Sequence, residues 1–139
     1  MTAVKKLGLR YYVGGRTTDK KVWVGVRSEH ETRHRDLNPR NDLFNHSPDG
    51  FEYGYAGSGP AQLALAILAD HLKNRPEDMR YAKRIARLDD AELESSDKLA
   101  VRIHQAFKFI AITPIKGDSW QITSAQVTDY LKKMAAPRD

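Results

Sequence analysis

Apolar and aromatic side chains alternate with other residues in two stretches near the start of the chain, 7–13 and 22–26. Alternation with a period of two is typical of strands, because successive side chains point to opposite faces. The intervening segment, 14–19, is rich in the Gly, Thr and Asp residues that favour turns. The pattern predicts a β-hairpin. One face would carry Leu7, Leu9, Tyr11 and Val13 together with Val22, Val24 and Val26. The other face would carry Arg10, Tyr12, Lys21, Trp23 and Arg27.

The middle of the chain changes from mostly polar to almost wholly apolar. Residues 28–42 predict an irregular connection, and the segment 47–50, Ser-Pro-Asp-Gly, has the composition of a tight turn. A brief alternation at 51–55 predicts a short strand. From 61 to 72 the residues are apolar nearly all round a helix, which predicts a central, buried helix opened by Pro60.

Three further helices and a second hairpin are predicted after this helix. The helices cover 76–88, 96–107 and 124–134, and the last begins with the capping-box spacing of Thr and Gln. Two strands, 109–115 and 120–122, are predicted between them. Runs of strands and runs of helices favour the α+β class. We therefore predict a single α+β domain over 1–139, in which a small antiparallel sheet of two hairpins packs with a central buried helix and about three further helices.

The amino-acid composition limits the cellular compartment and the kinds of catalysis that we expect of this chain. The chain has no Cys, which excludes disulfides and thiol catalysis and fits a reducing compartment. Residues 1–6 are not followed by an apolar run, so they do not predict a secretory signal. The longest apolar stretch, 63–69, is too short to cross a bilayer. We expect a cytoplasmic protein without a membrane partner.

Charge is unevenly distributed along the chain, whose net charge is +5. Residues 1–40 carry ten Lys or Arg and four Asp or Glu, whereas residues 41–72 carry four acids and no Lys or Arg. This distribution suggests two surfaces with different partners. The alternative is that the basic side chains only keep a small protein soluble.

The segment 43–68 carries the most specific motif, LFNHSPDGFEYGYAGSGPAQLALAIL. It resembles the domain-of-unknown-function family 6166, whose pattern is roughly NHSPxGFxWGYxGSGPAQLALA. Tyr53 stands where that family often has Trp. The resemblance implies a bacterial, phage or plasmid context and implies no activity. Because small phage proteins of this kind are sometimes antagonists of host defence, it also raises a counter-defence role as a hypothesis.

The glycines before the central helix predict a ligand site. Backbone N–H groups at a helix N-terminus attract phosphate or carboxylate, and glycines let a ligand approach the backbone. The segment lacks the Lys-Ser/Thr ending of a P-loop. The alternative is a tight turn that only caps a core helix. The hypothetical ligand-binding residues are His46, Ser47, Tyr53, Tyr55, Gly57, Ser58, Gly59 and Gln62.

Two histidine patterns suggest catalysis, but each is a weaker signal than the glycines before the central helix. Residues 30–34, His-Glu-Thr-Arg-His, match H-E-x-x-H, which binds Zn²⁺ when both histidines share a helix face. Their flanks are polar and charged, so no apolar stripe would anchor such a helix. The segment 46–52 brings a His, a Ser and acids together, but catalytic triads are assembled in space rather than by adjacency. We predict no metal, no cofactor and no catalytic residue.

Basic and aromatic residues on the second hairpin face predict a partner surface. Aromatic rings stack on bases and cations contact phosphates, and the same residue types anchor protein interfaces. A basic stripe at helical spacing, Arg80, Lys83, Arg84 and Arg87, extends this set. Three interpretations of this surface stay open: it contacts nucleic acid or a nucleotide, it contacts a protein, or it has no function.

The leading hypothesis is a non-enzymatic binding protein of a phage or other mobile element. It would engage a host protein, a nucleic acid or a phosphate-bearing ligand, in a counter-defence role. The alternative is a small enzyme or nucleotide-binding domain that uses the Gly57–Gly59 loop. A homo-oligomer is a further alternative.

Overall fold

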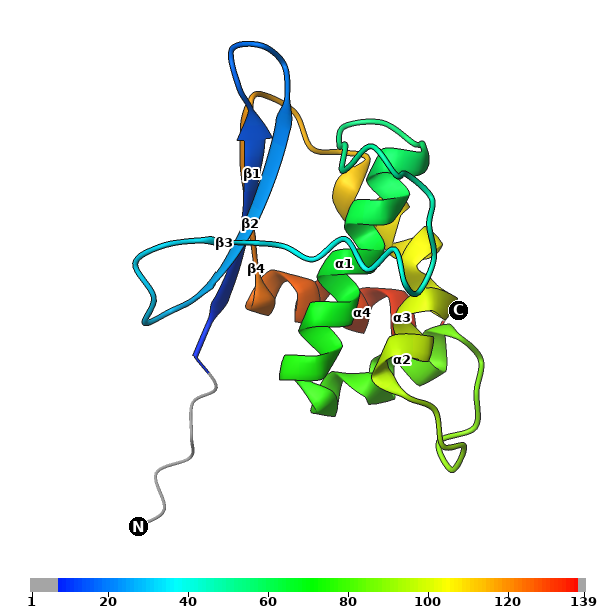
Figure 1. Ribbon diagram of the computed structural model, residues 1–139. Coiled ribbons are helices and arrows are strands. Elements are labelled where there is room, and N and C mark those ends of the chain that lie inside the picture. The colour runs from blue at the N-terminus through cyan, green and yellow to red at the C-terminus, as the bar shows by residue number, and fades with distance from the viewer. Residues whose placement is uncertain (1–7, 138–139) are drawn as a thin grey trace.

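The computed structural model describes residues 8–137, with a four-stranded sheet on one side of a group of helices (Figure 1). The sheet order is β3-β2-β1-β4, and every neighbouring pair is antiparallel. The predicted α+β class is confirmed. The strands are β1 (Arg10–Arg16), β2 (Val22–Ser28), β3 (Arg35–Asp36) and β4 (Ser119–Thr123).

Within residues 8–137, four α-helices supply most of the remaining core, to which Leu37 and Tyr53 of the loop after β3 also contribute. The helices are α1 (Ser58–Asn74), α2 (Met79–Ile85), α3 (Ser96–Phe107) and α4 (Ser124–Ala135), and a 3₁₀ turn at Pro76–Asp78 precedes α2. Helix α1 is buried on nearly all sides, as its composition predicts, and it runs between the sheet and α3 (Figure 1). No helix within residues 8–137 is long and apolar enough to cross a membrane.

Side-chain caps fix the predicted starts of two helices. The Ser95 side chain accepts a hydrogen bond from the Lys98 N–H and begins α3. Thr123 and Gln126 form the predicted capping box that begins α4. Such caps satisfy backbone donors that have no partner inside the helix. Helix α1 begins two residues before the predicted Pro60, with Gly57 as its N-cap.

The predicted faces of the first hairpin are correct for β2 and wrong for β1. The register pairs Tyr11 with Arg27 and Tyr12 with Val26, so Arg10 and Tyr12 share the inner face with the valines. Tyr12 is fully buried, whereas Trp23 lies on the outer face and is 43% exposed. Alternation assigns sides within one strand, but the connecting turn sets the register between strands. Leu7, which was placed in the first predicted strand, lies outside the described residues.

The predicted second hairpin is also wrong. Residues Lys108–Ile112 continue α3 as a π-helical turn, and β4 pairs with β1 instead of with this segment. Aromatic and β-branched residues gave it a strand-like composition, but burial of Phe107 and Ile112 in the core keeps it helical. Residues 51–55 form no strand. The segment 28–42, which was predicted to be irregular, contains β3.

Candidate binding surfaces

Gln62 of α1 holds several backbone groups of the loop between β3 and α1. Its amide nitrogen donates to the carbonyls of Pro39 (2.6 Å) and Phe44 (3.0 Å). Its amide oxygen accepts from the backbone N–H groups of His46 (2.7 Å) and Ser47 (3.3 Å). Gln62 is fully buried. All four hydrogen-bonding positions of the amide are therefore used within the fold.

His46 pairs with His104 of α3, and their Nε2 atoms lie 2.7 Å apart. His104 donates from Nδ1 to the Val101 carbonyl (2.6 Å), so in its neutral form its Nε2 accepts from His46. Burial, followed by the charge of Lys108, lowers the pKa of His46. Burial also lowers the pKa of His104. The pair therefore favours neutral rings, and the Lys108 ammonium opposes a bound cation.

No Ser–His–acid relay forms around His46 within residues 8–137. Its Nε2 contacts His104, and its ring stacks on Phe44 with 4.2 Å between the ring centroids. A His–acid contact elsewhere, His71 Nε2 to Asp78 Oδ2 at 2.7 Å, is buried. Thr128 donates to the same oxygen (2.6 Å), so this pair joins α1 to α4 in the interior.

A carboxylate lies beside the N-terminus of α1. A Cβ added at Gly59 would meet the Cβ of Glu52 at 2.5 Å, so glycine is needed there for space. Glu52 forms an ion pair with Arg16 (2.9 Å). An acid near a helix N-terminus is favourable, but it repels phosphate. This position explains Gly59 without a ligand.

The other residues of the hypothetical ligand site have mixed exposure. Tyr53 is 2% exposed, donates to the Gly117 carbonyl (3.0 Å) and lies under the Arg16 guanidinium. Ser58 and Tyr55 are exposed, and Gly57 contacts the Tyr55 ring. These residues contribute to the core and to a loop surface.

The H-E-x-x-H match falls in the connection between β2 and β3, which is not helical. Glu31 accepts from the Ser28 N–H (2.8 Å) and from Arg35, and these donors lower the pKa of Glu31 to about 2. Because this segment is not helical, His30 and His34 do not share a helix face. Among residues 8–137, no three potential metal ligands gather.

Within residues 8–137, all helices lie on one side of the sheet, and none covers its outer face (Figure 1). The Arg27 guanidinium carbon lies 4.2 Å from the centroid of the Tyr11 ring. Trp23 and His34 lie beside each other, with 6.3 Å between their ring centroids. A shallow hollow of about 860 Å³ is lined by Val13, Trp23, Arg27, Glu31, His34 and Gln121, among others. We call this surface the sheet face.

The residues of the predicted basic partner face lie in separate parts of the molecule. Arg10 pairs with Asp70 (2.9 Å) on the inner side of the sheet, and Lys21 lies exposed in the hairpin turn. On α2, Arg80 stacks on Tyr81 and Lys83 donates to the Asp90 carbonyl. Arg84 and Arg87 line a different hollow at the far end of the helices. The structure therefore does not bring these cations into one continuous face.

Sequence reasoning missed Phe109 and Ile110, which are 58% and 36% exposed. A strand prediction over 109–115 gives no reason to connect them with α2. The signal that could have found them is the inner stripe of α3, which continues through Phe107 to Ala111. That continuation would leave Phe109 and Ile110 on the outside.

A family model described as "Family of unknown function (DUF6166)" matches residues 12–91, more than half of the chain. No curated protein and no solved structure matches. The matched region includes the hairpin, the loop held by Gln62, and helices α1 and α2.

Proposed function

We propose that this chain, which belongs to the family of unknown function DUF6166, is a non-enzymatic protein that binds a partner protein through the sheet face. The observation that carries the proposal is Trp23, which is 43% exposed on a sheet surface that no helix of the described part of the chain covers. Trp, Tyr and Arg are the residues that most often dominate the energy of protein interfaces. Here, Trp23, Tyr11 and Arg27 lie on the same side of the hairpin.

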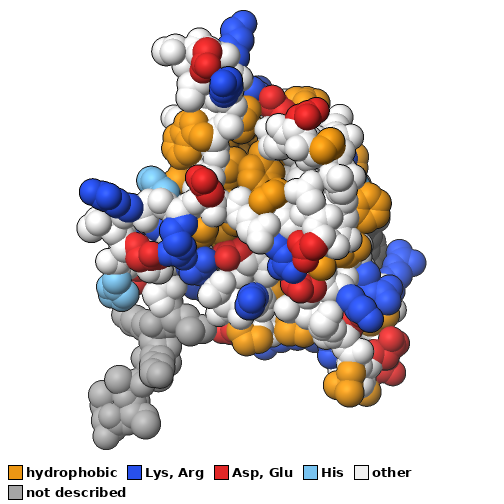
Figure 2. All heavy atoms as spheres, viewed as in Figure 1, with side chains coloured by type: hydrophobic (Ala, Val, Ile, Leu, Met, Phe, Trp, Pro, Cys, Tyr) orange, Lys and Arg blue, Asp and Glu red, His pale blue; other side chains and the backbone are white. Residues whose placement is uncertain are grey.

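The charge of the sheet face favours a protein over a nucleic acid. Among the residues that line its hollow, Arg27 and Glu31 carry opposite charges, and the other polar groups are neutral or histidine. A nucleic-acid site needs several cations that follow the phosphates. Figure 2 shows Lys, Arg, Asp and Glu side chains intermixed on the visible surface. A counter-defence protein of a phage or other mobile element, which inhibits a host protein complex, is the biological role we propose for this surface.

Site-specific cross-linking tests the proposal. A photoreactive phenylalanine analogue at position 23 is expected to cross-link a defined protein in cells that express the chain. The matched control is the same analogue at Leu93, which is 98% exposed and remote from the sheet. With that partner purified, Trp23→Ala should weaken binding by about 30-fold. Equal cross-linking at both positions, or unchanged affinity of Trp23→Ala, would contradict the proposal.

A further inference from the structure

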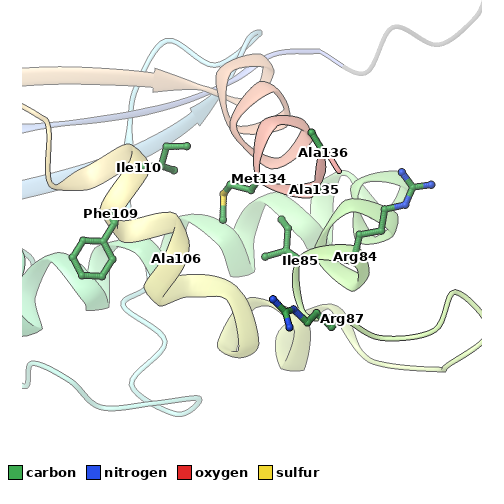
Figure 3. A pocket seen from close by; sticks show the side chains of 9 residues that line it. All are labelled: Arg84, Ile85, Arg87, Ala106, Phe109, Ile110, Met134, Ala135 and Ala136. Atoms are coloured by element: carbon green, nitrogen blue, oxygen red, sulfur yellow. The ribbon is translucent and has the colours of Figure 1, made fainter. Parts of the chain in front are cut away.

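A second hollow lies between α2, the π-helical turn after α3, and the C-terminal end of α4. Its volume is about 730 Å³. Ile85 and Met134 lie at its centre, Phe109 lies on the side of the π-helical turn, and Arg84 and Arg87 lie on the side of α2 (Figure 3). We call it the helix-end groove. It shares no lining residue with the sheet face.

The π-helical turn after α3 supplies part of the apolar side of the groove. Phe107, Lys108, Ala111 and Ile112 are buried. The wider turn leaves two consecutive large residues outside, Phe109 at 58% and Ile110 at 36% exposure. π-Helical turns inside α-helices are frequent at functional sites. Two adjacent exposed apolar residues beside an apolar hollow are typical of a docking surface.

The basic side of the groove has no internal counter-charge. Within residues 8–137, neither Arg84 nor Arg87 has a carboxylate within 4.0 Å, whereas Arg10, Arg16 and Arg40 all do. Helix α2 itself contains no acid. Both guanidinium groups are therefore available to an external carboxylate.

Arg87 also has an unusual backbone. It has a φ of +59°, and the bonds from Arg87 N–H to the Arg84 carbonyl and from Leu88 N–H to the Lys83 carbonyl form a Schellman ending of α2. Glycine is the residue usually found at this position, because a side chain is disfavoured there. The chain therefore keeps an arginine beside the groove in a conformation that disfavours it. Such a local conflict is expected where a side chain has a function.

We infer that the helix-end groove binds an acidic, amphipathic segment of a partner protein. Large apolar side chains of that segment would contact Ile85, Phe109 and Met134, and its carboxylates would contact Arg84 and Arg87. Helix-in-groove recognition combines an apolar stripe with flanking charges in this way. Two cations beside an aliphatic floor suit a peptide better than a nucleic acid, which needs more cations and stacking surfaces.

Amide NMR with a defined probe tests this inference. The probe is an acetylated peptide of about 14 residues that repeats Leu-Glu-Glu-Leu-Glu-Ala-Leu, which places leucines on one helix face. Its expected effect is a saturable set of shift changes confined to 84–88, 106–110 and 134–136. The same peptide with every Glu replaced by Lys should produce no such set. Shift changes elsewhere, or equal binding of the Lys peptide, would overturn the inference.

Charge reversal separates the groove from general attraction to a basic protein. Arg84→Glu with Arg87→Glu should weaken binding of the Glu peptide at least about tenfold and should allow the Lys peptide to bind. The matched control, Arg80→Glu with Lys83→Glu, makes the same change of charge on the same helix and should bind as the wild type does. Equal losses in the two double variants would overturn the inference.

Two further variants address folding and the chain's own end. Arg87→Gly removes one guanidinium at a position that favours glycine, so it should keep or raise the melting temperature while it weakens peptide binding. A chain ending at Pro137 should bind the peptide with unchanged affinity. Unchanged binding by Arg87→Gly would overturn the inference. A clear gain of affinity on truncation would also overturn it, because the chain's own end would then be the occupant.

Discussion

At the scale of single residues, Gln62 shows how a motif that resembles a ligand site serves the fold. Its amide replaces the missing partners of four backbone groups in the preceding loop. A buried backbone group without a partner costs as much as a lost hydrogen bond. A residue that satisfies four such groups is needed wherever an irregular loop covers a core helix.

Gln62→Ala is expected to lower the free energy of unfolding by about 3 kcal/mol, because several buried backbone groups lose their partners. Urea denaturation measures the loss, and hydrogen exchange should show faster opening of the backbone N–H groups of His46 and Ser47. The control is Gln105→Ala, at an exposed position of α3. A loss of less than about 1 kcal/mol for Gln62→Ala would contradict this role.

The His46–His104 pair gives a prediction on pH. The pKa of each imidazole is below its ordinary value, so the unfolded chain takes up protons at a higher pH than the folded chain. The stability contribution of the pair is therefore fully present above a pH of about 6.5 and is lost as the pH falls below it. Urea denaturation between about pH 7.5 and pH 5 should show this decline.

The double variant His46→Gln with His104→Gln should show a smaller slope of stability against pH over the same interval. The slope is compared rather than the stability itself, because the variant also loses packing. His30→Gln, at an exposed position of the β2–β3 connection, should keep the wild-type slope. An unchanged slope in the double variant would show that other groups titrate in this interval.

At the scale of elements, the π-helical turn divides neighbouring aromatic residues between the core and the surface. Phe107 is fully buried and packs edge-on against Tyr130, whereas Phe109 is 58% exposed. The sequence-based prediction placed Phe107 on the inner stripe of the helix 96–107 and Phe109 in a separate strand, 109–115. The helical continuation gives them opposite environments.

Phe107→Ala should lower the free energy of unfolding by about 4 kcal/mol, as expected for a large buried side chain. Phe109→Ala should change it by less than about 1 kcal/mol. Thermal or urea denaturation of the two variants, side by side, measures the difference. Similar losses for both would support a strand over 109–115 and would contradict the π-helical turn.

At the scale of the whole molecule, the uneven charge of the sequence is largely used in internal pairs. Arg10 pairs with Asp70, Arg16 with Glu52, and Arg40 with both Asp42 and Asp97. The basic first part of the chain and the acidic middle part therefore contact each other. The sequence-based suggestion of two oppositely charged surfaces does not hold for these residues, whereas Arg84 and Arg87 have no such partner within residues 8–137.

Asp70→Asn should destabilise the protein by about 2 kcal/mol, because Asp70 accepts two bonds from Arg10 and one from the Tyr12 hydroxyl. Urea denaturation measures the change. Asp49→Asn, at an exposed position of the loop, should change stability by less than about 0.5 kcal/mol. Equal effects of the two substitutions would mean that the Arg10–Asp70 pair contributes little.

Sequence by itself determined the elements that depend on local chemistry. The apolar run of α1, the Ser95 cap and the Thr123–Gln126 capping box specify helices through contacts within a few residues. The first hairpin follows from alternation around a turn. The α+β class follows from the order of these elements, and the match to the family pattern could be read from the motif at 43–68.

Only the tertiary structure decided the hairpin register, the partner of β4 and the helical state of 109–112. It also decided which cations lack an internal partner. Each of these depends on residues far apart in sequence, such as Arg10 with Asp70 or His46 with His104. Local composition cannot report such contacts, because burial and pairing energies arise only when the elements pack together. For the same reason, neither the sheet face nor the helix-end groove could be defined from the order of the residues.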